Sequence, residues 1–112
     1  MPPTESPLPT AALHILLAIG PEVRHGYAIM TEVAASTAGA VRLAPGTLYT
    51  NIKRLLAAGL IEEAAPPATD QEDARRRYYR LTLAGRRIVA DEVARMEGLV
   101  ARARDWVREA SG

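Results

Sequence analysis

Hydrophobic residues recur at helical spacing in the first third of the chain and predict two helices there. The first covers residues 11–19, with Thr10 as its expected N-cap, and nearly every side of it is apolar. We therefore expect this helix to be packed between other elements. The second begins near Gly26 and runs to about Ala35, and its apolar positions form one stripe. The residues of that stripe are Ile29, Met30 and Val33.

A third helix is predicted between Pro45 and Gly59, because proline favours a first helical turn and glycine favours the position after the last turn. Its inward stripe consists of Leu48, Ile52 and Leu55. A second face carries small hydroxyls, an amide and a guanidinium at positions i, i+3, i+4 and i+7, without an acidic side chain. The residues of this face are Thr47, Thr50, Asn51 and Arg54.

Short strands are predicted on both sides of a polar loop in the second half of the chain. Residues 60–63 form the first strand and residues 75–81, with alternating polarity, form the second. Residues 41–43 are compatible with a further, minimal strand. Three helices followed by a hairpin is the element order of a winged helix-turn-helix, so the predicted fold class is mainly α with a small β-hairpin.

A long amphipathic helix is predicted from Leu83 to about Ala110, with Thr82 as its N-cap. Its apolar positions are spaced 4, 3, 4, 3 and 4 residues apart, which is a heptad seam. The seam comprises Val89, Val93, Met96, Val100, Ala103 and Val107. A unit of about 70 residues offers little surface to cover so long a helix. We therefore expect a homodimer whose last helices pack on each other or on the partner's first helix.

A length of 112 residues corresponds to one small domain. We divide the chain into a flexible N-terminal tail (1–9), a winged helix-turn-helix domain (10–82) and a C-terminal dimerisation helix (83–112). Cysteine is absent, which excludes a disulfide framework, a thiolate zinc site and a cysteine nucleophile. The longest apolar run is shorter than the roughly 20 residues that span a bilayer. We expect a cytoplasmic protein that does not associate with membranes.

Positive charge is concentrated locally, although the net charge is only +1. Six of thirteen positions between Arg75 and Arg87 are arginine, and none is acidic. The segment 33–61, which contains the third helix, also lacks acidic residues. Phosphate binding requires unneutralised cations on one surface, and Arg75, Arg76 and Arg77 are the candidates on the predicted wing. The alternative is that these arginines only keep the wing soluble.

The polar face of the third helix has the chemistry of a recognition helix. Asparagine pairs with adenine and arginine with guanine, and threonine contacts a thymine methyl group or a phosphate. Tyr49 and Lys53 flank this face and are candidates for phosphate contacts, although Tyr49 fits equally well as a half-buried packing residue. On an isolated helix such a face would be an ordinary solvated surface. The predicted element order favours DNA binding.

Catalytic, metal and cofactor sites are not expected in this chain. His14 and His25 fall on different segments without convergent ligands, so we expect a core histidine and a loop histidine. Glu62 and Glu63 are adjacent on a predicted strand and point to opposite sides of it. The sequence contains neither a recognisable nucleophile triad nor a glycine-rich phosphate loop. We therefore exclude an enzyme, and the lack of metal ligands also disfavours a metal-responsive sensor.

Short motifs between Leu13 and Gly85 together resemble those of PadR-family transcriptional regulators, in particular compact members with one C-terminal dimerisation helix. The motifs are Gly26-Tyr27, Pro45-Gly46-Thr47-Leu48-Tyr49, Lys53-Arg54-Leu55, Gly59-Leu60-Ile61, Arg76-Arg77-Tyr78-Tyr79-Arg80-Leu81-Thr82 and Gly85. The resemblance implies a dimeric winged-helix protein that binds double-stranded DNA. It also implies a repressor, and in this family repression is often relieved by a small aromatic or drug-like ligand.

Two positions depart from the family pattern. Ala44 and Pro45 stand where the family usually offers Ser or Asn as a cap for the third helix. A drug-binding branch has a tryptophan midway along the last helix, where this chain has Met96, and Trp106 lies almost three turns later. The resemblance therefore does not extend to an aromatic sandwich at the centre of the dimer.

Two classes of function remain open from the sequence. The first is a sequence-specific DNA-binding transcriptional regulator, with a repressor as the expected form. The second is a winged-helix module that binds a protein partner and no DNA, because one fold serves many functions. The near-neutral net charge keeps the second class open. Salt-dependent DNA binding distinguishes the two.

Overall fold

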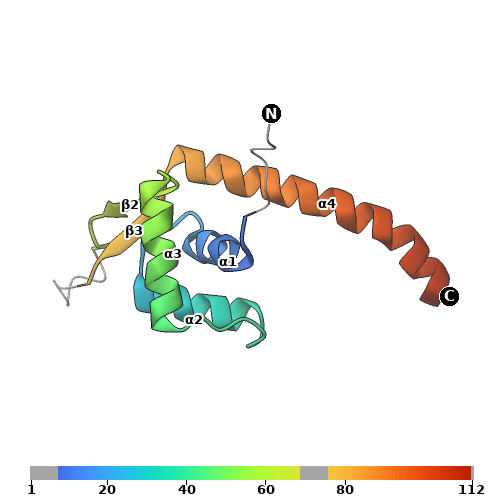
Figure 1. The fold of residues 1–112 in the computed structure, drawn as a ribbon, viewed down its shortest axis with the longest axis horizontal. Coiled ribbons are helices and arrows are strands. Elements are labelled where there is room, and N and C mark those ends of the chain that lie inside the picture. The colour runs from blue at the N-terminus through green and yellow to red at the C-terminus, as the bar shows by residue number, and fades with distance from the viewer. Residues whose placement is uncertain (1–7, 69–75, 112) are drawn as a thin grey trace.

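The computed structural model describes residues 8–68 and 76–111, and these form four helices and a small sheet (Figure 1). The elements follow one another in the order α1, β1, α2, α3, β2, β3 and α4. The helices are α1 (Thr10–Ile19), α2 (Gly26–Ser36), α3 (Pro45–Ala57) and α4 (Leu83–Ser111). The four predicted helices are thus confirmed. The predicted tail (1–9) lies outside the described residues as far as residue 7.

The sheet is antiparallel and has three strands in the order β1-β3-β2. They are β1 (Arg24–His25), β2 (Ile61–Ala64) and β3 (Tyr78–Leu81). The minimal strand predicted at 41–43 is wrong. Its backbone is held instead by Thr37, whose hydroxyl accepts a hydrogen bond from the Val41 amide (3.0 Å) and contacts the Val41 carbonyl (3.3 Å).

Helix α1 lies at the centre of the core and contacts α2, α3, α4 and β3. Ile15, Leu16 and Ile19 have no exposed surface, which confirms the prediction of a helix packed between other elements. Leu17 is the exception, with 46% of its surface exposed. The predicted cap was wrong: Pro9 occupies the N-cap position without a side-chain hydrogen bond, because the helix begins at Thr10 itself.

Helix α3 has the predicted inward stripe, since Leu48, Ile52 and Leu55 are all buried. Its N-terminus has no side-chain cap, and its first residue is proline. Its C-terminus closes with the two hydrogen bonds of a Schellman motif, from the Leu60 amide to the Leu55 carbonyl and from the Gly59 amide to the Leu56 carbonyl (3.0 Å each). Gly59 has a positive φ of 73°, as the motif requires, so α3 ends sharply.

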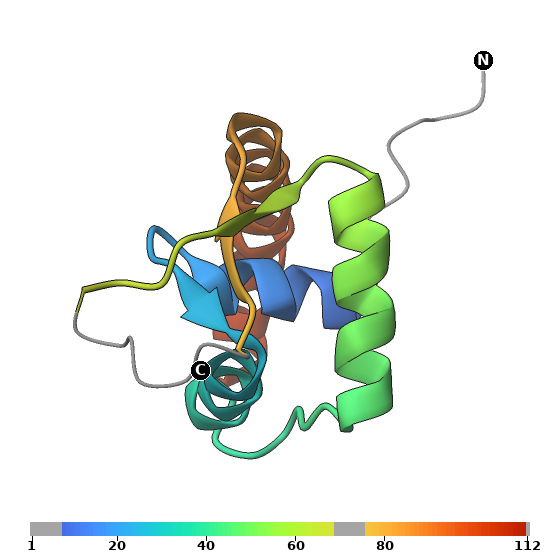
Figure 2. The same cartoon turned by 90° about the vertical axis from the view of Figure 1, so that its left-hand side faces the viewer.

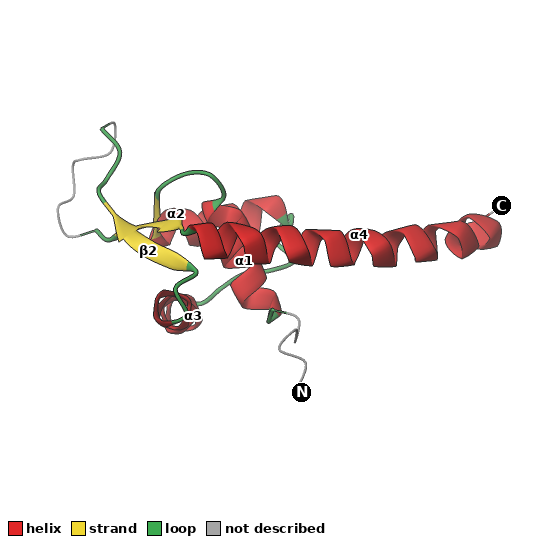
Figure 3. Ribbon diagram, turned by 90° about the horizontal axis from the view of Figure 1, so that it is seen from above, coloured by secondary structure: helices red, strands yellow, loops and turns green. Residues whose placement is uncertain are grey.

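Helix α4 projects from the rest of the chain, as Figures 1 and 3 show. Its 29 residues correspond to a length of about 43 Å. Its hydrophobic contacts with the core, among the described residues, come from Ile88 and Val89 near its beginning. Further along, Glu92 is buried and accepts two hydrogen bonds from Arg95 (3.0 and 2.8 Å), which lower the pKa of the Glu92 carboxyl. Among the described residues, we find no helix long and apolar enough to span a membrane.

Candidate nucleic-acid interface

The polar face predicted for α3 lies on the surface of the molecule. Figure 2 shows α3 along one side of the chain, with α1 on its inner side. Thr47, Thr50 and Arg54 are exposed, and so is Lys53 beside them. No acidic residue occurs in the segment 33–61, so nothing within this helix neutralises the two cations. The face is therefore open to a ligand that carries hydrogen-bonding groups and negative charge.

Asn51 is half-buried and is held along its own helix. Its Nδ2 donates a hydrogen bond of 2.9 Å to the carbonyl oxygen of Thr47, one turn earlier. To pair with a base edge, the Asn51 amide must share or break this bond. The Asn51 side chain is therefore less available for a base contact than the exposed Arg54 side chain. The helical spacing alone did not indicate this difference.

A groove of about 420 Å³ separates the start of α2 from α3 and β3. We call it the α2–wing groove, where the wing is β2, β3 and the loop between them. Its lining residues are His25, Gly26, Tyr27, Tyr49, Arg76, Arg77 and Tyr79. Tyr49, Arg76 and Arg77 were predicted from the sequence as site residues, and the structure brings them together. Tyr27 and Tyr79 were missed as site residues, because the three lining segments are far apart along the chain.

His25 joins α2 to the wing. Its Nδ1 accepts a hydrogen bond from the Ala28 amide (3.2 Å) and so caps α2, while Nη1 of Arg76 lies 3.1 Å from its Nε2. Its ring meets that of Tyr78 edge-on, with the centroids 5.4 Å apart. The prediction of a loop histidine is wrong, because His25 lies in β1. Its contacts place the Arg76 guanidinium beside the first turn of α2.

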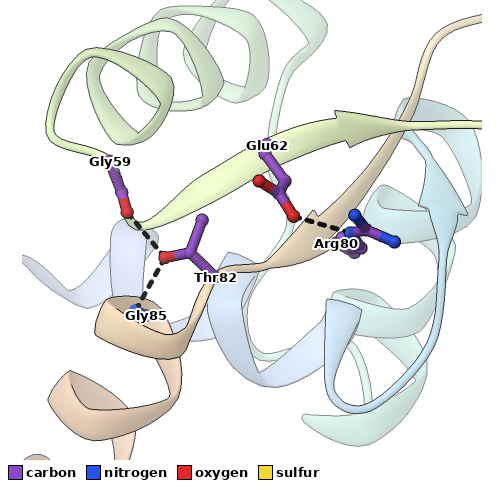
Figure 4. A network of polar contacts seen from close by, with 5 residues as sticks. All are labelled: Gly59, Glu62, Arg80, Thr82 and Gly85. Carbon is purple, nitrogen blue, oxygen red and sulfur yellow. Dashed lines mark hydrogen bonds and ion pairs between the residues drawn. The ribbon is translucent and has the colours of Figure 1, made fainter.

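The wing arginines are partly neutralised by carboxylates of β2, which could not be predicted from the local charge pattern. Nη1 of Arg77 lies 3.1 Å from Oε1 of Glu63. Nε of Arg80 lies 2.7 Å from Oε2 of Glu62 across the strand pair (Figure 4). All four side chains are between 48% and 70% exposed, and such ion pairs contribute only about 0–1 kcal/mol to stability. The guanidiniums can therefore exchange their carboxylate partners for phosphates at little cost.

The remaining arginines of the predicted cluster lie elsewhere. Arg75 lies outside the described residues. Arg86 and Arg87 are exposed in the first turns of α4 and thus do not belong to the wing. Only Arg76 and Arg77, among the described members of the cluster, line the α2–wing groove.

Tyr79 forms a buried wall of the groove, with 3% of its surface exposed. Burial raises the pKa of its phenol above the ordinary value of 10.0, and the nearby carboxylate of Glu63 raises that pKa further. The phenol is therefore uncharged at neutral pH, and a bound anion meets no negative charge from it.

The predicted seam of α4 is largely uncovered in the single chain. Val93, Val100 and Val107 are exposed, and Val89, Met96 and Ala103 are half-buried. Val93, Met96 and Val100 also line a shallow groove of about 380 Å³ along the helix. Next to the seam, Leu99 and Trp106 are exposed as well, with 47% and 63% of their surface accessible. Within the part of the chain that the structure describes, no element covers the apolar stripe on α4.

The histidine and carboxylate side chains that the structure describes do not gather at a metal site. Within residues 8–68 and 76–111, no three such side chains lie close enough to hold a metal ion. His14 is half-buried on α1 and His25 lies in β1, on a different element.

Comparisons with known proteins give a family from the sequence and a fold from the solved structures. The sequence model described as "Transcriptional regulator PadR-like family" matches residues 15–91. A search of the curated proteins gave no significant match. Three similar solved structures represent the fold.

A transcriptional regulator from Clostridium thermocellum has a TM-score of 0.69 and 24% identity, over 87% of this chain and 89% of that one. RosR of H. salinarum has a TM-score of 0.67 and 25% identity, over 93% of this chain and 94% of that one. Bacillus subtilis PadR, solved in complex with operator DNA, has a TM-score of 0.65 and 18% identity, over 78% of this chain and 48% of that one.

Proposed function

The chain belongs to the Transcriptional regulator PadR-like family, and we propose that it represses transcription by binding operator DNA as a homodimer. Members of this family are transcriptional regulators and not enzymes. The observation that carries the proposal is the exposed face of α3, which presents hydrogen-bonding and cationic side chains without an acidic neighbour in its segment. A solved structure of the same fold, that of Bacillus subtilis PadR, contains operator DNA.

In this proposal α3 enters the major groove of double-stranded DNA. Arg54 is exposed and donates to the O6 and N7 acceptors of a guanine. Thr47 and Thr50 contact thymine methyl groups or phosphates, and Asn51 pairs with adenine once its amide leaves the Thr47 carbonyl.

The α2–wing groove contacts the sugar-phosphate backbone beside α3. Arg76 and Arg77 supply positive charge there, and Tyr49 supplies a hydroxyl donor. The groove adds Tyr27, whose side chain is 66% exposed, to the phosphate-contacting residues expected from the sequence. Lys53 contacts the backbone from α3, and Arg75 does so from the wing.

The homodimer forms through the seam of α4, which buries its exposed valines against a second copy. Two recognition helices related by a two-fold axis then contact half-sites about 34–36 Å apart. A small aromatic or drug-like effector that changes the packing of the seam would relieve repression. The protein would act in the cytoplasm, where it has access to the DNA. A thermal-denaturation screen with aromatic compounds tests this step, and no shift for any compound would contradict it.

The second candidate function is a protein-interaction module that does not bind DNA. The ion pairs of Arg77 with Glu63 and of Arg80 with Glu62 favour it, because they reduce the positive charge of the wing. The near-neutral net charge of +1 points the same way. The acid-free face of α3 argues against it.

Fluorescence anisotropy separates the two functions. The labelled duplex comes from the region upstream of the gene, the competitor is a scrambled duplex, and the titration is repeated at two salt concentrations. We expect salt-sensitive binding that prefers the native duplex. Arg54→Ala should weaken that binding by about 1–3 kcal/mol and leave the scrambled duplex unaffected. Absence of binding at low salt would favour the interaction module.

A further inference from the structure

Thr82 connects the end of α3 with the start of α4. Its hydroxyl donates a hydrogen bond of 2.6 Å to the Gly59 carbonyl, directly after α3, and accepts one of 3.0 Å from the Gly85 amide in the first turn of α4 (Figure 4). Its own amide donates to the Leu60 carbonyl at 3.1 Å. One residue thus caps α4 and ties it to the backbone that terminates α3. We call Gly59, Leu60, Thr82 and Gly85 the corner.

The backbones at the corner are in direct contact. A Cβ added at Gly85 would overlap the carbonyl oxygen of Leu60, so α4 crosses this carbonyl as closely as a glycine permits. On the other side of the contact, the Schellman motif fixes Gly59 and Leu60 relative to the last turn of α3. The β2–β3 pairing continues from the corner with Ile61 opposite Leu81. The end of α3 is thus joined to the start of α4 directly, through backbone contact and hydrogen bonds.

The angle at this corner, together with the packing of α3 on α1 and α2, sets the direction of α3 relative to α4. Helix α3 has 13 residues and a length of about 20 Å. A rotation of about 10° at the corner moves its far end by about 3.5 Å, close to the rise of about 3.4 Å per base pair. A dimer held together through α4 transmits such a rotation to both recognition helices, in opposite directions.

We propose that Thr82 is a positioning residue that sets the spacing of the DNA half-sites contacted by the dimer, by fixing the angle between α3 and α4 through its hydrogen bond to the Gly59 carbonyl. This inference rests on the proposed function as a dimeric DNA-binding protein. Thr82 itself makes no contact with DNA in this proposal. Its effect is therefore on the preferred spacing and not on the contacts within one half-site.

Three substitutions separate the hydrogen bond to the Gly59 carbonyl from the one that caps α4 at the Gly85 amide. Thr82→Val removes the hydroxyl and with it both interactions. Thr82→Asp keeps an oxygen that accepts from the Gly85 amide, as a good N-cap does, but has no hydrogen to donate to the Gly59 carbonyl. Thr82→Ser restores both. Thr31→Val is the matched control, because the Thr31 hydroxyl donates to the Tyr27 carbonyl within α2, away from the corner.

The first measurement requires no DNA. The chain has no cysteine, so Gly46→Cys and Arg102→Cys introduce two spin labels, one at the start of α3 and one on α4. Labelled chains diluted with unlabelled chains report the distance within one protomer by pulsed electron paramagnetic resonance. We expect a narrow distribution for the otherwise unchanged chain, Thr82→Ser and Thr31→Val. We expect a broadened or shifted one for Thr82→Val and Thr82→Asp.

The second measurement uses operator duplexes whose half-sites are moved apart or together by one base pair, and a duplex with a single half-site. We expect the unchanged chain to lose about tenfold or more in affinity when the spacing changes, because one half-site is then misplaced. Thr82→Val and Thr82→Asp should bind all spacings with similar affinity. Their binding to a single half-site should match that of the unchanged chain.

The outcomes separate this proposal from the function on which it rests. A distance distribution in Thr82→Asp with the same width and the same mean distance as in the unchanged chain overturns the role of the hydrogen bond. An unchanged spacing preference in a folded Thr82→Asp chain, checked by circular dichroism, overturns the role in half-site spacing. A wild-type chain that binds no duplex contradicts both the proposed function and the spacing role. DNA binding without any spacing preference contradicts the spacing role alone.

Discussion

The hydroxyl of Tyr49 lies directly against Gly26, so that a Cβ added at residue 26 would be 2.6 Å from the Tyr49 Oη. Tyr49 belongs to α3 and Gly26 is the first residue of α2. The glycine is therefore required for space and not for an unusual φ. Its contact with Tyr49 connects the two helices and holds the phenol at the edge of the α2–wing groove.

Gly26→Ala should displace the Tyr49 hydroxyl and weaken DNA binding. The atom in the way is the end of a flexible side chain, so we expect a small change in the melting temperature. The lost phosphate contact should cost up to about 1.5–3 kcal/mol of binding free energy, the range for a hydrogen bond to a charged group. Anisotropy titrations with the operator duplex measure this change.

A double-mutant cycle with Tyr49→Phe tests the cause. Phenylalanine lacks the hydroxyl, so Gly26→Ala should have little further effect on DNA affinity in that background. Additive effects of the two substitutions would show that Gly26 acts independently of Tyr49.

Glu63→Gln should strengthen DNA binding. The substitution removes the carboxylate that lies 3.1 Å from the Arg77 guanidinium and leaves Arg77 unneutralised at the groove. We expect the slope of log affinity against log salt to steepen by less than about 0.9, the contribution of one full phosphate contact, because Arg77 contacts the backbone in both proteins and only the competing carboxylate is lost.

Glu62→Gln is the control for this change. Glu62 pairs with Arg80, and neither residue lines the α2–wing groove. Its substitution removes the same charge and should leave the salt slope unchanged. An equal increase in DNA affinity in Glu63→Gln and Glu62→Gln would indicate an effect of net charge alone.

The helices could be predicted from the sequence because their signals are local. The apolar positions of α1 and the pair Pro45 and Gly59 around α3 lie within single elements, and the structure confirms both. The cap of α1 could not be predicted in the same way. Thr10 follows Pro9, and the choice of N-cap between such neighbours is not determined by residue type alone.

The groove and the charge of the wing depend on contacts that local patterns do not encode. Strand β1 has only two residues, both polar, and it forms because Arg24 is opposite Tyr79 of β3. The pairing of Arg77 with Glu63 depends on the register of the hairpin, which is set across a long loop. The arginines of the predicted cluster are neighbours along the chain. In the structure only two of the described ones, Arg76 and Arg77, line the groove.

Val100→Asp should convert the dimer to monomers. Val100 is 49% exposed in the single chain and lies in the seam of α4. A carboxylate buried there without a partner is unfavourable by several kcal/mol, which exceeds what a short helical interface tolerates. Analytical ultracentrifugation measures the mass, and operator affinity should fall together with it.

Ala94→Asp provides the comparison on the same helix. Ala94 is exposed and lies on the side of α4 away from the seam. Ala94→Asp should leave the sedimentation of the dimer unchanged. Dissociation by both substitutions, or by neither, would contradict the assignment of the seam.

Two glycines of α4 should respond to alanine in opposite ways. At Gly98 nothing lies within 4 Å of an added Cβ, and at Gly85 the added Cβ overlaps the Leu60 carbonyl. Alanine is the better helix former, so Gly98→Ala should stabilise the fold by about 0.5–1 kcal/mol. Gly85→Ala gains the same propensity but forces two backbones apart, and such overpacking costs about 1–3 kcal/mol or more. Thermal denaturation at one fixed protein concentration measures both, because the melting temperature of a dimer depends on concentration. A stabilising Gly85→Ala would mean that α4 is free to move away from Leu60, and the corner would then not be rigid.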